Sequence, residues 1–334
     1  MALINTEHVD TALEFLRALS PLDGFFPADY RQAYIFRGVG SADYRLVPSA
    51  FRDGAILRWH QSSVEAPLST LKDQIRAEAT TLWEFYLAAD RQGLRLPEDS
   101  QQFREVLKEY VSVGDVLFAQ IESGKMPWPP DHLLSLTALA QHYGVPTRLL
   151  DWTWSPYIAA YFAASTVARG AASVCVWAFS VVNREIQELL IKREDRRLQL
   201  VSAPAGDNEN LRAQRWVGLV YRHLAANMQE PFIHRSYDEL ADDSFGSTPI
   251  FWKLTLPSHE AGELLRLLST LDVDSSTVFP GFNGAAKAVS EMSRWPSQKE
   301  WRSSGRPNLY WAQHEALCER QLRDRGARRG SSDK

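Results

Sequence analysis

The stretch Leu133–Ala164, LLSLTALAQHYGVPTRLLDWTWSPYIAAYFAA, limits the fold of this chain more than any other part of its sequence. Apolar residues recur in it at helical spacing as far as Tyr143. Gly144 and Pro146 follow, and they predict the end of a helix, because glycine tolerates a left-handed turn and proline cannot continue a helix. One helix is therefore expected to end at Tyr143.

A strand and a second helix are expected directly after this turn. The run 148–152 is too short for a helix and predicts a buried strand. Ser155 and Pro156 predict the N-cap and the first turn of the next helix. The expected order is thus helix, tight turn, strand, helix.

Polar residues cluster around this expected strand. The end of a strand and the start of the next helix often face a shared crevice that binds ligands, so the cluster predicts a site. Its members are His142, Thr147, Arg148, Asp151 and Thr153. In the alternative interpretation, Arg148 and Asp151 form a structural ion pair and His142 only closes a helix.

A second candidate site lies nearer the N-terminus. The short apolar strand pattern at 34–36 is followed by Arg37, Gly38 and Gly40. A guanidinium can hold an anion with a bidentate fork, while glycines let the backbone come close to it. Arg52 is a second possible anion contact. The alternative is that Arg37 pairs with a carboxylate of the fold.

Helices are expected between these two regions. Leu68–Gly93 fits a long helix, and 103–123 fits a further helical region. Glu78 of the long helix is expected on its solvated side, with a position facing Arg37 or Arg52 as the alternative.

The C-terminal half predicts further strands and one exposed segment. Polar residues before the apolar run 216–221, Gln214 among them, predict a second rim of the crevice. The polar interval Met228–Ser247 is expected to be an exposed loop. Other strand patterns are 172–179, 197–204, 251–256 and 277–279.

Composition narrows the class of protein. With 334 residues and 45% hydrophobic content, the chain can bury a sizeable core as one large domain or two ordinary ones. A net charge of -4 gives no broad footprint for nucleic acid, which is therefore an unlikely partner despite an arginine-rich tail.

Cysteine usage and hydropathy indicate a reducing, cytoplasmic location. Cys175 and Cys318 show no CxxC or Cys/His ligand spacing, so neither a disulfide framework nor a metal site is expected. The N-terminus has no cationic start followed by an apolar core, and no segment has the uncharged length that crosses a bilayer. Membrane insertion is not expected.

Taken together, these motifs resemble the FRG domain family, whose name spells Phe36, Arg37 and Gly38. The resemblance predicts an FRG domain over 1–300, with a helical insertion at about 66–126. It leaves 301–334 as a C-terminal extension with a partly disordered basic tail. The matching motifs are FRG, YRLVPSAFR, RQGLRLP, AQHYGVPTRLLDWTWSPYIAAYFAA, NLRAQ and TVFPGFNGAA.

FRG domains in turn resemble ADP-ribosyltransferases. This resemblance implies an α+β fold with a mixed, bent central sheet flanked by helices, a helical N-terminal half, and NAD as substrate. The implied catalytic residues are Arg37, His142 and Asp151. The implied contacts with NAD are Arg37, Gly38, Arg52, Tyr143, Thr147, Arg148, Thr153 and Gln214.

Transferases of this type use a carboxylate to stabilise the positive charge that develops as nicotinamide leaves. Family members often carry acidic residues in the segment that reads FPGFNG here, where this chain has Gly281 and Asn283. Asp151, Asp274 or Glu260 are the alternatives for the missing charge.

The function expected from the resemblance is an ADP-ribosyltransferase-like or NAD-consuming effector in bacterial or phage conflict, as antiphage defence or toxin. Its partners would be a nucleotide and a protein target, with no metal. The alternative is a non-catalytic module that senses a nucleotide or a protein.

Overall fold

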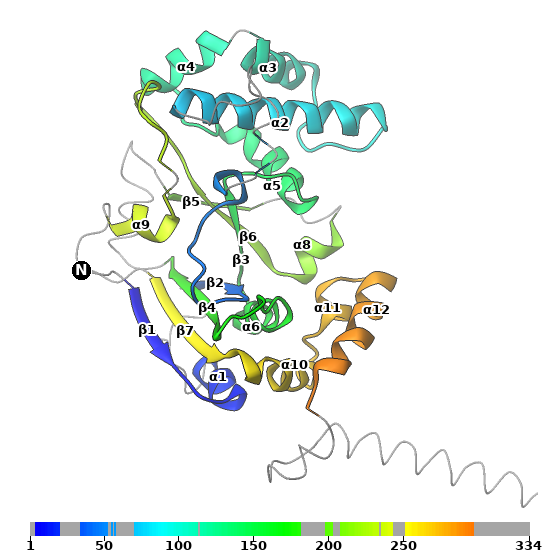
Figure 1. Ribbon diagram of the computed structural model, residues 1–334. Helices are drawn as coiled ribbons and strands as arrows, with labels where there is room; N and C mark the ends of the chain where they lie inside the picture. Colours follow the sequence, from blue (N-terminus) through cyan, green and yellow to red (C-terminus); the bar gives the residue numbers. More distant parts are fainter. Residues whose placement is uncertain are drawn as a thin grey trace, which may run out of the picture.

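A mixed seven-stranded sheet, in the order β1-β7-β4-β2-β3-β6-β5, runs through the centre of the computed structural model (Figure 1). The structure describes residues 4–20, 34–52, 55, 57, 70–112, 114–181, 198–202, 208–233, 235–242 and 251–296. β1 pairs parallel with β7, and the other neighbours are antiparallel. The strands are β1 (Ile4–His8), β2 (Tyr34–Val39), β3 (Leu149–Thr153), β4 (Ser173–Ser180), β5 (Leu198–Val201), β6 (Trp216–Tyr221) and β7 (Phe251–Pro257).

Eleven α-helices accompany the sheet within the described ranges, which confirms an α+β fold with a mixed sheet. The helices are α1 (Ala12–Ala18), α2 (Leu71–Arg91), α3 (Gln101–Ser112), α4 (Gly114–Glu122), α5 (Leu134–His142), α6 (Pro156–Ser165), α8 (Glu209–Ala213), α9 (Tyr237–Asp242), α10 (Ala261–Ser269), α11 (Ser275–Val278) and α12 (Phe282–Glu291).

The central segment folds as its sequence predicts. α5 ends at His142, and Gly144 takes a left-handed φ of 84°. β3 follows as a largely buried strand. The Ser155 side chain then accepts a hydrogen bond from the Ile158 amide as N-cap of α6, and Pro156 occupies the first turn. Local turn and capping signals therefore suffice to fix this part of the chain.

The sheet is almost divided between β2 and β3. These two strands share a single register pair, Phe36 with Thr153, whereas β2 pairs with β4 along its whole length. In Figure 1 the strands β3 and β6 accordingly run in a different direction from β2 and β4. Beyond this one pair the strands separate and leave a gap in the sheet.

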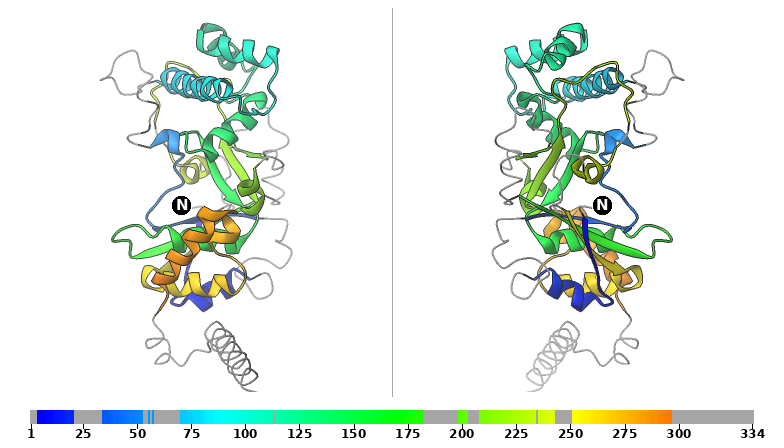
Figure 2. Two further views of the ribbon diagram at one scale, coloured as in Figure 1. Left: turned by 90° about the vertical axis from the view of Figure 1, so that its right-hand side faces the viewer. Right: turned by 90° about the vertical axis from the view of Figure 1, so that its left-hand side faces the viewer.

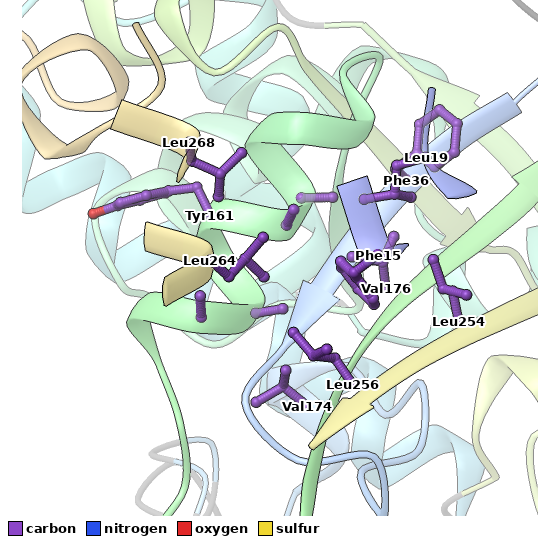
Figure 3. Close-up of a cluster of buried hydrophobic side chains, with 14 of the residues drawn as sticks. Phe15, Leu19, Phe36, Tyr161, Val174, Val176, Leu254, Leu256, Leu264 and Leu268 are labelled. Atoms are coloured by element: carbon purple, nitrogen blue, oxygen red, sulfur yellow. The ribbon is translucent and has the colours of Figure 1, made fainter. Parts of the chain in front are cut away.

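Helices α1, α6 and α10 cover one face of the sheet around β2, β4 and β7. Figure 3 shows side chains from both layers meeting in one apolar cluster, among them Phe15, Val176, Leu256 and Leu264, all of which are buried. Fully burying an aliphatic or aromatic side chain contributes about 1.5–3 kcal/mol. This cluster therefore holds α6 firmly beside the gap.

Two glycines allow α6 to approach β2 at backbone distance. A Cβ added to Gly38 would lie 1.8 Å from the carbonyl oxygen of Ala159, and one added to Gly40 would lie 1.7 Å from that of Thr166. The glycines of the FRG motif are thus needed for contact between helix and strand. Both glycines also line the cavity described below, so the expectation that they let the backbone come close to an anion stays a prediction.

A separate helical layer, α2 to α5, has its own apolar core. Figure 2 shows α2, α3 and α4 at the opposite end of the molecule from α1 and α10. Residues at the centre of this layer, such as Ile75, Leu107, Ile121 and Trp128, are fully buried.

A buried ion pair joins this helical layer to the sheet. Arg148, directly before β3, donates from Nε to Glu78 Oε2 at 2.7 Å and from Nη2 to Glu78 Oε1 at 2.9 Å. Trp128 Nε1 and Gln74 Nε2 also donate to this carboxylate, at 2.9 and 2.7 Å. Both charged side chains are at most 5% exposed. The sequence-based options for Glu78, a solvated position or a contact with Arg37 or Arg52, are therefore wrong.

The guanidinium of Arg148 also reaches β6. Its Nη1 donates to the Tyr221 carbonyl at 3.3 Å and lies 2.9 Å from Nδ1 of His223. The hydroxyl of Tyr237 donates to the Arg148 carbonyl and accepts from the Tyr221 amide. One buried cation thus connects α2, β3 and β6.

Several sequence-based expectations are wrong. The N-terminal half is not simply helical, since it supplies β1, β2 and, near its end, β3. Residues 277–279 do not form a strand, because Asp274 caps the short helix α11 there. The interval 228–247 contains α9, whose Tyr237 and Asp238 are buried. The extension 301–334 lies outside the described residues.

The packing of α6 on β2 predicts a large effect of Gly38→Ala. The added methyl group would meet backbone that cannot rotate away, so the free energy of unfolding should fall by about 3 kcal/mol or more. Gly170→Ala is the control. A Cβ at Gly170 would meet no neighbouring atom, so this substitution is penalised only by the left-handed φ of 77°, which costs about 1–2 kcal/mol. Urea unfolding of both variants measures the difference, and equal losses would contradict this view of the FRG motif.

The buried pair predicts that Glu78→Gln destabilises the protein strongly. The amide keeps the size of the side chain but leaves the Arg148 charge uncompensated, which costs about 3–5 kcal/mol at a buried pair. Asp90→Asn, which weakens the half-exposed pair between Arg104 and Asp90, serves as the control and should have a much smaller effect. Urea unfolding again gives the free energies; similar losses in the two variants would show that the Glu78 contact does not join the layers.

Candidate functional site

A cavity of about 420 Å³ lies at the gap between β2 and β3. Aromatic rings and polar or charged side chains share its wall, and converging polar groups of this kind are found in ligand pockets. Its lining comprises Phe36, Arg37, Gly38, Val39, Gly40, Tyr44, Arg52, Gln141, His142, Asp151, Trp152, Thr153, Phe162, Thr166, Gln214, Trp216 and Phe279.

Arg37 spans the gap from β2. Its Nη1 donates to the main-chain carbonyl of Asp151 at 2.6 Å, so a side chain supplies a bond to β3 where the strands no longer pair. No other hydrogen bond joins the Arg37 side chain to the described residues. Burial lowers the pKa of Arg37 from its ordinary value, and the nearby Asp151 opposes this shift. The guanidinium keeps its charge, and its remaining N–H groups are available to an anion.

The Asp151 carboxylate is held by two neutral donors. Trp216 Nε1 donates to its Oδ1 at 2.9 Å, and Gln141 Nε2 donates to its Oδ2 at 3.1 Å. Thr147 Oγ1 donates to Gln141 Oε1 at 2.6 Å, which fixes the amide so that its NH₂ group faces Asp151. The carboxylate is therefore held in one orientation without a direct cationic partner.

Two opposite charges thus face the same cavity without cancelling each other. Arg37 binds a carbonyl, and neither Arg37 nor Asp151 forms an ion pair with another described residue. The alternative in which Arg148 pairs with Asp151 is wrong, because Arg148 pairs with Glu78. Arg37 also forms no ion pair with a carboxylate among the described residues, contrary to the other alternative.

His142 stands at the cavity wall as a neutral ring. Burial lowers its pKa below the ordinary 6.5, with Asp151 opposing the shift. Its Nε2 lies 3.4 Å from Nδ2 of Asn210, which can donate to it when the ring is neutral. A neutral imidazole of this kind can accept a proton at pH 7.

The structure brings together seven of the ten predicted site residues. Thr147 acts only through Gln141, Arg148 belongs to the buried pair, and Tyr143 is 68% exposed outside this cavity. Those that line the cavity are Arg37, Gly38, Arg52, His142, Asp151, Thr153 and Gln214.

Thr153 and Gln214 are already engaged within the fold. Thr153 Oγ1 donates to the Gln214 carbonyl at 2.7 Å and accepts from the Ser155 amide at 3.0 Å. Gln214 Nε2 donates to the Val278 carbonyl at 3.3 Å. These two residues join β3, α8 and α11 at the rim.

Sequence reasoning missed several residues that shape the site. Gln141 and Trp216 orient Asp151, and Tyr44, Phe162 and Phe279 contribute rings to the wall. The sequence signals for these rings were the high tryptophan count and the aromatic residues within the FRG motifs. They do not tell which rings face a cavity.

The structure shows which of the three candidate carboxylates lies at the cavity. Asp151 lines the cavity. Asp274 instead caps α11, where its Oδ1 accepts from the Ser276 amide at 2.8 Å. Glu260 accepts from the Ala12 amide at 2.9 Å, away from the cavity lining.

Three further features of the described part of the chain bear on its chemistry and location. No group of three or more His, Cys, Asp or Glu side chains there is placed to hold a metal ion. Burial raises the pKa of the Cys175 thiol to about 12, so it is a poor nucleophile at neutral pH. None of the described helices combines the length and apolar character of a membrane span.

Comparison with known protein families identifies one region of the chain. Residues 32–171, from just before β2 to just before β4, match the family model of the FRG domain. The chain carries an FRG domain. The matched region includes α2 to α5 and most of the cavity wall. No curated protein and no solved structure matches the chain.

The environment of His142 in the FRG domain predicts a pH dependence of stability. Its folded pKa is lowered, so below about pH 6.5 the unfolded chain binds more protons and the free energy of unfolding falls as the pH drops. His142→Gln, which can still accept from Asn210, should show a shallower decline between pH 7.5 and 5.5 than the unchanged protein. Urea unfolding across this range measures both slopes, and identical slopes would contradict the buried, neutral state of the ring.

Proposed function

We propose that this FRG-domain protein binds NAD in the cavity between β2 and β3 and cleaves its nicotinamide–ribose bond. The observation behind the proposal is the pair of opposite charges that face this cavity without cancelling each other. NAD carries both an anionic pyrophosphate and a cationic pyridinium, so it complements both charges. A ligand with only one of these groups would leave one charge unmatched.

Arg37 is the proposed contact of the pyrophosphate. Its free N–H groups form a planar fork that suits phosphate oxygens, and burial strengthens such charge-assisted hydrogen bonds. The rings of Tyr44, Phe162 and Phe279 offer flat apolar surfaces to the nicotinamide and adenine. Arg52, more exposed at the rim, is a second possible phosphate contact.

Asp151 is the proposed catalytic carboxylate. As the C–N bond breaks, its electron pair leaves with nicotinamide and positive charge develops on the ribose. A carboxylate already held by Trp216 and Gln141 stabilises that charge without reorientation. A protein side chain or water then bonds to the ribose carbon and loses a proton, which neutral His142 accepts at Nε2 in place of the long contact with Asn210 Nδ2.

The near division of the sheet also agrees with this proposal. The family resemblance implies a split, bent sheet that grips NAD, and here the cavity lies where β2 and β3 separate. The proposed role in conflict between bacteria and phages rests on the resemblance alone.

The test combines nicotinamide release with NAD-induced thermal stabilisation. Asp151→Asn keeps the size of the side chain and should abolish nicotinamide release, and it should also weaken NAD binding because the pyridinium loses its anionic partner. Arg37→Ala should weaken NAD binding about tenfold to a hundredfold, because hydrogen bonds to charged groups contribute about 1.5–3 kcal/mol. Thr80→Ala on α2, whose hydroxyl bonds only within its own helix, is the control and should leave both readouts unchanged.

Each result decides between the candidate functions. Stabilisation by NAD without nicotinamide release, over long incubation at high protein concentration, would favour the non-catalytic sensing module. Neither stabilisation nor release would overturn the proposal altogether.

A further inference from the structure

A second cavity, of about 590 Å³, lies on the other side of the C-terminal end of α5. It shares no lining residue with the cavity at Arg37; His142 faces the first cavity and its neighbour Tyr143 faces the second. The lining comprises Phe85, Ala89, Leu94, Arg95, Leu96, Pro97, Glu98, Ser135, Leu139, Tyr143, Asn208 and Leu211.

The wall of this second cavity is mainly apolar and partly exposed. Leu94 and Tyr143 are 62% and 68% exposed although both contribute to the lining. Phe85, Leu139 and Leu211 complete the apolar surface. Apolar concave surface in contact with water is unfavourable, and it gains free energy when a ligand covers it.

Asn208 contributes to this wall a polar group without a hydrogen-bond partner among the described residues. Its Oδ1 accepts from the Leu211 amide at 3.2 Å and caps α8, so the opposite amide nitrogen is the donor left over. Asn208 is only 9% exposed, and its Nδ2 has no hydrogen-bond partner among the described residues. A buried donor without a partner is costly, and an acceptor brought by a ligand would remove that cost.

We infer that the second cavity binds a flat, apolar small molecule that carries one hydrogen-bond acceptor. Its rings cover the surface formed by Leu94, Leu139 and Tyr143, and its acceptor binds Nδ2 of Asn208. The inference does not depend on NAD, because the two cavities are lined by different residues.

Anilinonaphthalenesulfonate is a suitable probe, since it combines aromatic rings with sulfonate acceptors and fluoresces in apolar surroundings. The full chain should bind one molecule saturably. Leu94→Asp should abolish this binding, whereas Leu271→Asp, at a 50% exposed leucine outside the lining, should not change it.

Asn208→Asp tests the polar contact. Aspartate caps a helix as well as asparagine does, so α8 keeps its cap, but the donor becomes an acceptor. Probe affinity should fall about tenfold or more, as expected for a lost hydrogen bond to a charged group. Circular dichroism and thermal unfolding confirm that each variant is folded.

The first cavity is the main competing site for the probe. Arg37→Ala should leave the fluorescence titration unchanged if the probe occupies the second cavity. Loss of binding in Arg37→Ala, unchanged binding in Leu94→Asp, or no saturable binding at all would each overturn the inference.

Discussion

The buried pair of Glu78 and Arg148 is the contact on which the arrangement of this molecule depends. It places one guanidinium between α2, the start of β3 and the end of β6, with each carboxylate oxygen bonded twice. Two charges that are buried away from water are tolerated only when hydrogen bonds satisfy both of them as fully as here. Because β3 carries Asp151 three residues further on, the contact that joins the two layers also sets where the candidate site begins.

The candidate site follows from how β3 meets β2. The strands share one pair of residues, and the next connection is made by Arg37 through a main-chain carbonyl. Trp216 and Gln141 hold the Asp151 carboxylate, and Arg37 donates to the Asp151 main-chain carbonyl instead of to this carboxylate. The protein thus separates two charges that would otherwise neutralise each other, and this separation makes the cavity suitable for a ligand with both signs of charge.

The helices and strands that the sequence predicts correctly are those fixed by residues close to them in the chain. The end of α5, strand β3 and the cap of α6 depend on Gly144, Pro146 and Ser155, each acting within a few residues. The pairing of Glu78 with Arg148 joins residues 70 positions apart, and nothing in either local sequence specifies the partner. The same holds for Gly38 and Gly40. Their spacing in the sequence is compatible with a bound anion and with a packed helix, and only the structure shows that α6 packs against them.

The single pair between β2 and β3 has a mechanical consequence. A sheet joined by a continuous ladder resists bending, but here each group of strands has its own ladder and the two groups meet at one register pair, with few bonds between them. The Arg37 and Asp151 side chains lie beside this point, and the bond from Arg37 to the Asp151 carbonyl is one of the few that cross it. A ligand that contacted both side chains would add bonds across this narrow junction of the sheet and would thereby stiffen it.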